Sequence, residues 1–146
     1  MPPSIKEFRV TLNDVGDNEL LILKVRSMAQ QIGFCQTDQF MAATAASELG
    51  TNIIRYAKGG EVLVRAIQSG GRDGVEIIAT DQGPGIANVE TALQEGYSTL
   101  KGSLGMGLST VKRLSDEFHL ESEPGKGVRI CARIWVKHAA NRHASG

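Results

Sequence analysis

Hydrophobic and polar residues follow two patterns along the first part of the chain. Residues 8–12 alternate between apolar and polar side chains, which indicates a strand with one buried face. Residues 20–32 instead carry apolar side chains every three or four positions, which indicates a helix. Asn13-Asp14 can cap the start of this helix, and Gly33 can end it. The chain is therefore expected to open with a strand and a capped helix.

The same patterns continue to the end of the chain. A second helix is expected over about 39–57, with Thr37-Asp38 as its cap. Residues 61–67 and 75–79 have the β-branched character of strands, and Ser69–Gly74 between them is typical of a hairpin loop. The remaining expected elements are a short helix at 88–93, a mobile glycine-rich loop at 94–107, a helix at 106–118, and strands at 119–122 and 128–136.

Together these elements predict one α+β domain over residues 1–136. The expected architecture is a two-layer sandwich, in which a mixed and mostly antiparallel sheet carries helices on one face. The polar segment 137–146 is expected to be a flexible tail. At 146 residues the chain is long enough to bury a core of its own.

Composition and charge narrow the class of protein. The 16 basic and 16 acidic side chains balance, so the chain lacks the basic excess typical of proteins that bind nucleic acid or anionic membranes. We therefore expect no nucleic-acid partner and no membrane partner. No apolar run has the length of a membrane span, and the N-terminus does not resemble a signal peptide. Cys35 and Cys131 lack metal-ligand spacing, so we expect them to be reduced and buried in a cytoplasmic protein.

Asp81 stands just after the predicted 75–79 strand and just before a turn that contains Gly-Pro-Gly. A carboxylate in this place can accept a hydrogen bond from the exocyclic amine of a purine. Gly83 and Gly85 allow the backbone to approach a ligand closely, because neither carries a Cβ. Such sequences are also common in simple strand-ending turns, so this stretch alone leaves both interpretations open.

Glu48 and Asn52 are four residues apart in the second predicted helix, which places them one turn apart on one face. The Asn52 carbonyl oxygen could bind a hard cation such as Mg²⁺. The Glu48 carboxylate could accept a proton from a nucleophile. A solvated polar stripe would have the same composition, so this pair also has two interpretations.

The glycine-rich segment 102–107 leads into a predicted helix. Free backbone N–H groups and the positive end of the helix dipole make such a start suitable for phosphate, and Lys101 adds a positive charge. A flexible linker before a helix is the alternative. The segment is not a Walker A loop, because the required Gly-Lys-Ser/Thr ending is missing.

Three motifs appear in one order along the chain: Glu48-x-x-x-Asn52, Asp81-x-Gly83-x-Gly85 and Gly105-x-Gly107. Together they resemble the ATP-binding fold of the GHKL superfamily, which includes DNA gyrase, Hsp90, histidine kinases and MutL. The resemblance covers about residues 6–136. The sequences at 47–57, 81–86, 95–99, 104–108 and 111–114 are more closely similar to the RsbT-like switch kinases, which group with the anti-sigma kinases RsbW and SpoIIAB.

This resemblance implies a Bergerat fold that binds ATP with Mg²⁺. It implies transfer of phosphate to a Ser or Thr of a STAS-domain protein of the RsbS or RsbR type, which build stressosomes in a bacterial stress response. A released RsbT-like protein is further expected to activate a PP2C-type phosphatase of the RsbU type. Two alternatives remain: a binding module gated by nucleotide that carries out little chemistry, and an anti-sigma factor that binds sigma directly.

The resemblance also implies a role for each motif residue. Glu48 would be the catalytic base, Asn52 would hold Mg²⁺ against the phosphates, and Asp81 would accept from the adenine amine. The other nucleotide-binding residues that it implies are Gly83, Gly85, Ile86, Lys101, Gly105, Met106, Gly107 and Leu108. The 94–107 loop would act as a lid that excludes water.

One position departs from the family pattern. The last strand in these proteins usually begins Gly-Thr, and the threonine hydroxyl helps to bind adenine. Here Val128 follows Gly127, so that hydroxyl is missing. The loss of one hydrogen bond costs on the order of 1 kcal/mol, so we expect weaker nucleotide binding.

Overall fold

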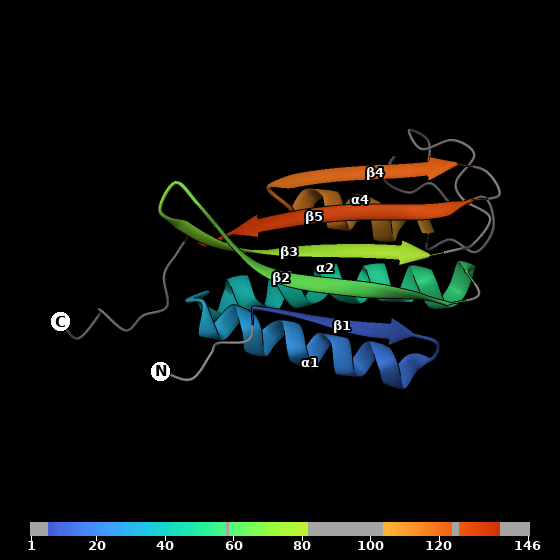
Figure 1. The fold of residues 1–146 in the computed structure, drawn as a ribbon, viewed down its shortest axis with the longest axis horizontal. Coiled ribbons are helices and arrows are strands. Elements are labelled where there is room, and N and C mark those ends of the chain that lie inside the picture. The colour runs from blue at the N-terminus through green and yellow to red at the C-terminus, as the bar shows by residue number, and fades with distance from the viewer. Residues whose placement is uncertain (1–5, 58, 82–103, 124–125, 138–146) are drawn as a thin grey trace.

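The structure, a computed structural model, describes residues 6–57, 59–81, 104–123 and 126–137. Helices and strands form two layers, with α1, α2 and α4 on one face of the sheet (Figure 1). The elements in chain order are β1 (Glu7–Leu12), α1 (Val15–Gln31), α2 (Gln36–Tyr56), β2 (Gly60–Ser69), β3 (Arg72–Asp81), α4 (Leu104–Leu114), β4 (Glu117–Glu123) and β5 (Gly127–Trp135).

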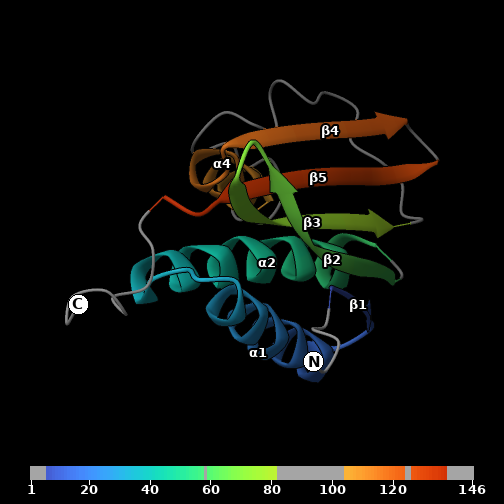
Figure 2. The same cartoon turned by 60° about the vertical axis from the view of Figure 1, so that its left-hand side comes forward.

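The five described strands form one sheet in the order β1-β2-β3-β5-β4, and each neighbouring pair is antiparallel. Helix α2 packs against both α1 and α4, so the three helices form a single layer (Figure 2). The prediction of an α+β sandwich with helices on one face is confirmed. Every neighbouring pair of described strands is antiparallel, because β3 and β4, which run in the same direction, are separated by β5.

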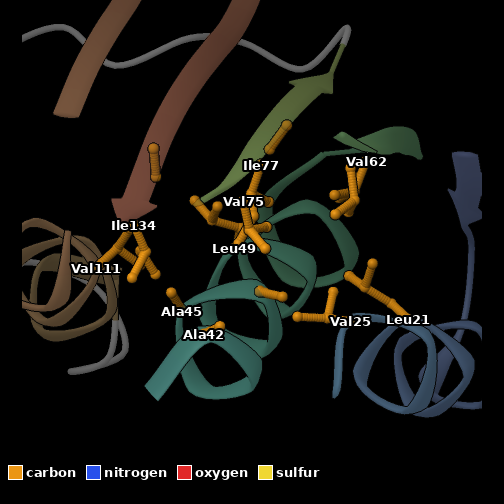
Figure 3. Close-up of a cluster of buried hydrophobic side chains, with 14 of the residues drawn as sticks. Leu21, Val25, Ala42, Ala45, Leu49, Val62, Val75, Ile77, Val111 and Ile134 are labelled. Atoms are coloured by element: carbon orange, nitrogen blue, oxygen red, sulfur yellow. The ribbon is translucent and has the colours of Figure 1, made fainter. Parts of the chain in front are cut away.

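The core lies between the sheet and the helical layer (Figure 3). Alternation along each strand turns every second side chain toward the helices, and helical spacing turns one face of each helix toward the sheet. The fully buried side chains that meet there include Leu21, Val25, Ala45, Leu49, Val62, Val75, Ile77, Val111 and Ile134.

The predicted start and end of α1 are confirmed. The Asp14 carboxylate accepts from the Asp17 backbone N–H at 3.1 Å, and the Asp17 carboxylate accepts from the Asp14 backbone N–H at 3.2 Å. This reciprocal pair satisfies two donors that a helix start otherwise leaves unpaired. Gly33 follows the helix with a φ of 105°, a conformation that favours glycine.

The predicted cap of α2 is wrong. The helix begins at Gln36, and its N-cap is Cys35, whose extended backbone provides no side-chain hydrogen bond. Asp38 instead lies in the first turn, where its negative charge is favoured by the helix dipole. Both cysteines are reduced, as expected, but they are partly exposed rather than buried.

Two other predicted boundaries also change. The hairpin turn between β2 and β3 is confined to Gly70 and Gly71, whose φ values of 60° and 80° fit a tight two-residue turn. Helix α4 begins at Leu104, two residues before the predicted start, so Gly105 lies in its first turn with Gly107 rather than in the predicted loop. It ends before Phe118, which belongs to β4 because Asp116 and the following residues pair with β5.

Several expectations fall outside the described residues: the short helix at 88–93, the 94–103 part of the loop, and the tail from 138 onward. Lys137, expected to begin the tail, forms an ion pair with Asp116 at 2.8 Å. None of the described helices is both long and apolar enough to cross a bilayer.

Candidate active site

Glu48 and Asn52 face the first turn of α4 from the neighbouring helix. Gly107 is buried there. A Cβ added to it would lie 2.9 Å from Glu48 Oε1, 3.5 Å from Asn52 Oδ1 and 3.7 Å from Asn52 Nδ2. The fold therefore brings together two of the three sequence motifs, and it does so because Gly107 lacks a side chain.

The side-chain amide of Asn52 is incompletely satisfied. Its Nδ2 is buried and has no hydrogen-bond partner within the described parts of the chain. Leaving a buried donor unpaired costs about 1–3 kcal/mol, and such groups are often found where a ligand completes the structure. Backbone and side-chain donors at a helix start favour an anion, so this amide is suitably placed for a phosphate group.

Asp81 ends β3 on the side of the sheet that carries the helices. It follows Val75, Ile77 and Ala79, which are all buried in the core and alternate with outward residues. Its partner across the sheet is Val128, the position where the family usually has threonine. Both residues line a cavity of about 240 Å³. The structure thus places Val128 where a hydroxyl would lie beside the Asp81 carboxylate.

The end of β3, the start of β5 and the last turns of α2 lie at the same end of the molecule (Figure 1). Asp81 and Asn52 come from these elements. The antiparallel β3–β5 pairing produces this arrangement, because the end of one strand must meet the start of the other. Acceptor, amide and helix start are therefore gathered at one end of the sandwich.

The other predicted site residues divide into two groups. Gly83, Gly85, Ile86 and Lys101 lie outside the described residues. Gly105 and Met106 lie in the first turn of α4, where backbone N–H groups have no partner within the helix. The Leu108 side chain is 1% exposed in the core, so its backbone N–H is the group that it could offer to a ligand.

A contact that no local sequence pattern indicated holds α2 in place behind the site. The Asn18 Nδ2 of α1 donates to the Ser47 carbonyl and to Thr51 Oγ1, each at 3.4 Å. Asn18 is 9% exposed, and it lies directly against Gly50, where a Cβ would be 2.0 Å from its Oδ1. A buried polar residue facing a helical glycine is a pairing that becomes visible only when both helices are placed.

The cavity beside Asp81 has a polar rim that the sequence patterns did not predict. The residues concerned come from β3, β4, β5 and the turn before β5: Thr80, Glu121, Ser122, Lys126 and Arg129. The sequence Pro-Gly-Lys-Gly places Lys126 in a turn, but no local pattern indicates that this turn lies near Asp81. Within the described ranges, no group of three or more His, Cys, Asp or Glu residues could hold a metal ion.

The arrangement of these groups is suited to binding phosphate and accepting a proton. A carboxylate and an amide stand next to a helix start, and a second carboxylate ends the neighbouring central strand. The helix start and the amide can bind phosphate, and the first carboxylate can accept a proton beside it. These are the groups that a nucleotide-dependent enzyme requires.

Comparison with known proteins first defines the class. Residues 37–138 match the family of histidine kinase-, DNA gyrase B- and HSP90-like ATPases. The match spans more than half of the chain, and the chain belongs to this family. The GHKL prediction is therefore confirmed.

Within this class the particular relatives are also clear. The chain is 44% identical over 112 residues to the serine/threonine-protein kinase RsbT of Bacillus subtilis, a match that covers 77% of this chain and 84% of RsbT. The prediction of an RsbT-like serine/threonine-protein kinase is confirmed. The anti-sigma F factor of Thermoanaerobacter sp. (strain X514) is 36% identical over 92 residues. That match spans 60% of this chain and 63% of the relative's length.

Solved structures share the fold at lower identity. The RsbU and RsbW domains of a Mycobacterium tuberculosis protein superpose with a TM-score of 0.58 at 18% identity, covering 92% of this chain and 34% of theirs. Full-length ShkA in complex with AMPPNP gives a TM-score of 0.55 at 19% identity, covering 84% of this chain and 31% of that one. These likenesses support the same two-layer fold.

Proposed function

We propose that this protein transfers the γ-phosphoryl group of ATP to a serine or threonine hydroxyl of a STAS-domain protein of the RsbS or RsbR type. The observation that carries the proposal is the meeting of Glu48 and Asn52 with Gly107 at the start of α4. The 44% identity to a serine/threonine-protein kinase supports the choice of a hydroxyl acceptor.

The residues present are suited to ATP. Asp81 would accept from the adenine amine, with Gly83, Gly85 and Ile86 around the base. Asn52, whose Nδ2 is buried without a partner among the described residues, would face the phosphates. Lys101 and the backbone of 105–108 would complete the phosphate site. In this arrangement the missing Cβ of Gly107 keeps the space beside Glu48 and Asn52 open.

Glu48 would act as the general base. It accepts the proton of the acceptor hydroxyl while the hydroxyl oxygen bonds to the γ-phosphorus, and the bond from that phosphorus to the β,γ-bridging oxygen breaks to release ADP. A neutral hydroxyl is a poor nucleophile until its proton has a nearby acceptor.

Magnesium would be held by Asn52 together with phosphate oxygens. Mg²⁺ commonly has one or two protein ligands and completes its octahedral shell with phosphates and water, so a single amide oxygen is sufficient here. When bound, the ion neutralises charge on the phosphates during transfer.

The proposed partners act in a switching module in the cytoplasm. The STAS-domain protein would be both substrate and binding partner, and release from it would let this chain activate an RsbU-like phosphatase. A structure with the same fold contains an RsbW domain and an RsbU domain in one chain, so the two types of domain occur together in that protein.

The test is the intact mass of a STAS-domain protein encoded beside this gene, after incubation with this protein and Mg-ATP. We expect an added phosphate on its Ser or Thr. Glu48→Gln should remove transfer while ATP binding is kept, because the amide cannot accept the proton. Glu19→Gln, on the exposed side of α1, is the matched control and should leave transfer unchanged. Full transfer by Glu48→Gln would exclude Glu48 as the base.

A second candidate is a nucleotide-gated binding module or an anti-sigma factor with little kinase activity. Val128 beside Asp81 is the observation that favours it, because the missing hydroxyl weakens the nucleotide site. The similarity to an anti-sigma F factor is consistent with it. A stable, nucleotide-dependent complex in which no phosphate is transferred would support this candidate over the kinase.

A further inference from the structure

Helix α2 carries a large aromatic side chain in solvent. Phe40 is 65% exposed. Single exposed apolar residues are common on protein surfaces, so this value has meaning only together with the surface around it. Figure 2 shows α2 between α1 and the β4–β5 side of the molecule, in the middle of the helical layer.

The face around Phe40 is almost free of charge. Between Gln36 and Asn52, all of which the structure describes, Asp38 is buried and Glu48 is the one charged side chain that reaches solvent. We call the accessible side chains that share a helical face with Phe40 the α2 face: Gln36, Thr37, Phe40, Met41, Thr44, Ser47 and Thr51.

The neighbouring helix has a different surface. Four charged side chains of α1 reach solvent, namely Asp17, Glu19, Lys24 and Arg26. Depletion of charge together with an aromatic residue and methionine is the composition typical of the centre of a protein–protein interface. The α2 face has this composition, whereas the exposed apolar side chains of α1, Val15, Leu20 and Leu23, lie among these charged residues.

The α2 face is continuous with the proposed catalytic base. Phe40, Thr44 and Glu48 form a row at i, i+4 and i+8, so Phe40 lies about 12 Å from Glu48 along the helix axis. The Thr44 hydroxyl donates to the Phe40 carbonyl at 2.8 Å. A partner could therefore cover Thr44 without leaving its hydroxyl donor unpaired. A folded protein that presents a hydroxyl to Glu48 must also cover surface at this distance.

We propose that the α2 face is the docking surface for the protein substrate, with Phe40 as its main anchor. The occupant is the folded domain that carries the acceptor hydroxyl, and it would contact Phe40 with an apolar, uncharged patch beside that hydroxyl. This inference rests on the proposed kinase function. It adds a specificity-determining residue that lies outside the nucleotide site.

Other occupants fit the α2 face less well. Nucleic acid and anionic lipid surfaces are bound through clustered lysine and arginine, and the face has neither between Gln36 and Asn52. A second copy of this chain would make the protein self-associate through Phe40, which is an outcome that the experiment can detect.

The experiment compares Phe40→Ala with Leu23→Ala. Leu23 is 66% exposed on α1, so it matches Phe40 in exposure but lies on a helix without Glu48. The substrate is the same STAS-domain protein, and the measurements are KM and kcat for that protein and Kd for ATP. We expect Phe40→Ala to raise KM at least about tenfold, as for an aromatic hot spot. The Kd for ATP should stay within twofold of the parental value. Phe40→Leu, which keeps a large apolar side chain, should have a KM close to that of the parent.

Three results would overturn the proposal. They are an unchanged KM in Phe40→Ala, an equal rise in Leu23→Ala, and a dimer of the parent protein that Phe40→Ala dissociates. If the parent protein transfers no phosphate, the kinase proposal fails. The docking surface is then tested separately, by measuring the affinity of the complex with the STAS-domain protein by calorimetry. Phe40→Ala should weaken that complex at least about tenfold. A parent that neither binds nor modifies the STAS-domain protein would overturn both proposals.

Discussion

Gly107 sets the distance between the two helices that form the site. Its neighbours are the side chains of Glu48 and Asn52, and any side chain at 107 would enter the space beside them. Glycine within a helix normally costs about 0.5–1 kcal/mol relative to alanine. Glycine at position 107 therefore lowers helix stability slightly but leaves room for the side chains of Glu48 and Asn52.

Gly107→Ala should reduce phosphoryl transfer by roughly a hundredfold. The added Cβ would lie 2.9 Å from Glu48 Oε1, so the carboxylate must move, and a displacement of about 1 Å can cost about that much in rate. The melting temperature should stay unchanged or rise, because alanine favours the helix. Single-turnover transfer and thermal unfolding measure the two effects, and a variant with the parental transfer rate would contradict the role of this contact.

Val128→Thr should tighten ATP binding up to about fivefold. Val128 pairs with Asp81 across the sheet, so a threonine hydroxyl would lie beside that carboxylate and could add one hydrogen bond, worth about 1 kcal/mol. Calorimetric titration with Mg-ATP measures the change. Val128→Ala is the control, because it alters the same side chain without adding a hydroxyl. Equal affinities in all three proteins would mean that position 128 does not contribute to nucleotide binding.

At the scale of elements, the position of α2 depends on its contact with α1. Asn18 donates to Ser47 and Thr51 on either side of Glu48 in sequence, and it packs on Gly50. The Ser47 carbonyl and the Thr51 side chain face α1, while Glu48 and Asn52 face α4. One helix therefore carries Glu48 and Asn52, the residues proposed to act on the phosphates, on one side and is held in place on another.

Gly50→Ala should destabilise the fold by about 1–3 kcal/mol, the usual cost of overpacking. The new Cβ would lie 2.0 Å from Asn18 Oδ1, and the two helices would have to separate or the amide would have to rotate. Urea unfolding measures the loss. The cost should be much smaller in an Asn18→Ala background, since the clash is then removed; an equal cost in both backgrounds would point to another cause.

At the scale of the whole molecule, the buried carboxylate of Glu76 is the centre of an ion-pair network on the face of the sheet away from the helices. Glu76 of β3 is 2% exposed. It accepts from Arg65 Nε of β2 at 2.9 Å and from Arg133 Nε of β5 at 2.8 Å. Arg133 also reaches Glu117 of β4 at 3.1 Å. The network therefore links four strands, and it leaves the helical face free for the site.

The same network sets the protonation of its members. Burial alone would raise the pKa of Glu76, but the hydrogen bonds from Arg133 and Arg65 outweigh burial and hold it below its ordinary value of 4.5. Burial and the charge of Glu76 raise the pKa of the Cys131 thiol. Cys131 therefore stays protonated near neutral pH, and its Sγ donates to Glu76 Oε2 at 3.5 Å.

The lowered pKa of Glu76 predicts acid sensitivity. A carboxyl whose folded pKa is below its unfolded pKa adds stability above the unfolded value, and that stability is lost as the pH falls through the folded value. The free energy of unfolding should therefore fall below about pH 4.5. At pH 7, Glu76→Gln should be less stable by about 2 kcal/mol, and it should lack this part of the pH dependence.

The matched control for that prediction is Glu61→Gln. Glu61 pairs with Arg9 at the surface, where the side chains are 39% and 57% exposed, and such pairs contribute about 0–1 kcal/mol. Denaturant unfolding between pH 7 and pH 3 compares the three proteins. If Glu76→Gln keeps the parental pH profile, the network does not control the acid response.

Local sequence signals predicted the α1 cap, the strand that ends at Asp81 and the shared helical face of Glu48 and Asn52 on α2. They failed at Cys35, which begins α2 in an extended conformation without a side-chain cap, so the polar residues at 37 and 38 fall inside the helix. They also failed at Glu76, which sits in an apolar run and gave no sign of its two arginine partners. Those partners come from strands on either side, so no local pattern contains them.

Residues close together in sequence were enough to define the type and order of the elements, the motif residues and the family. Helical and strand periodicity, capping and glycine turns are local effects, since they depend on backbone geometry within a few positions. The tertiary structure alone decided that Gly107 faces Glu48, that Val128 pairs with Asp81, and that Phe40 is left in solvent. These relations depend on strand order and helix packing, which join distant parts of the chain.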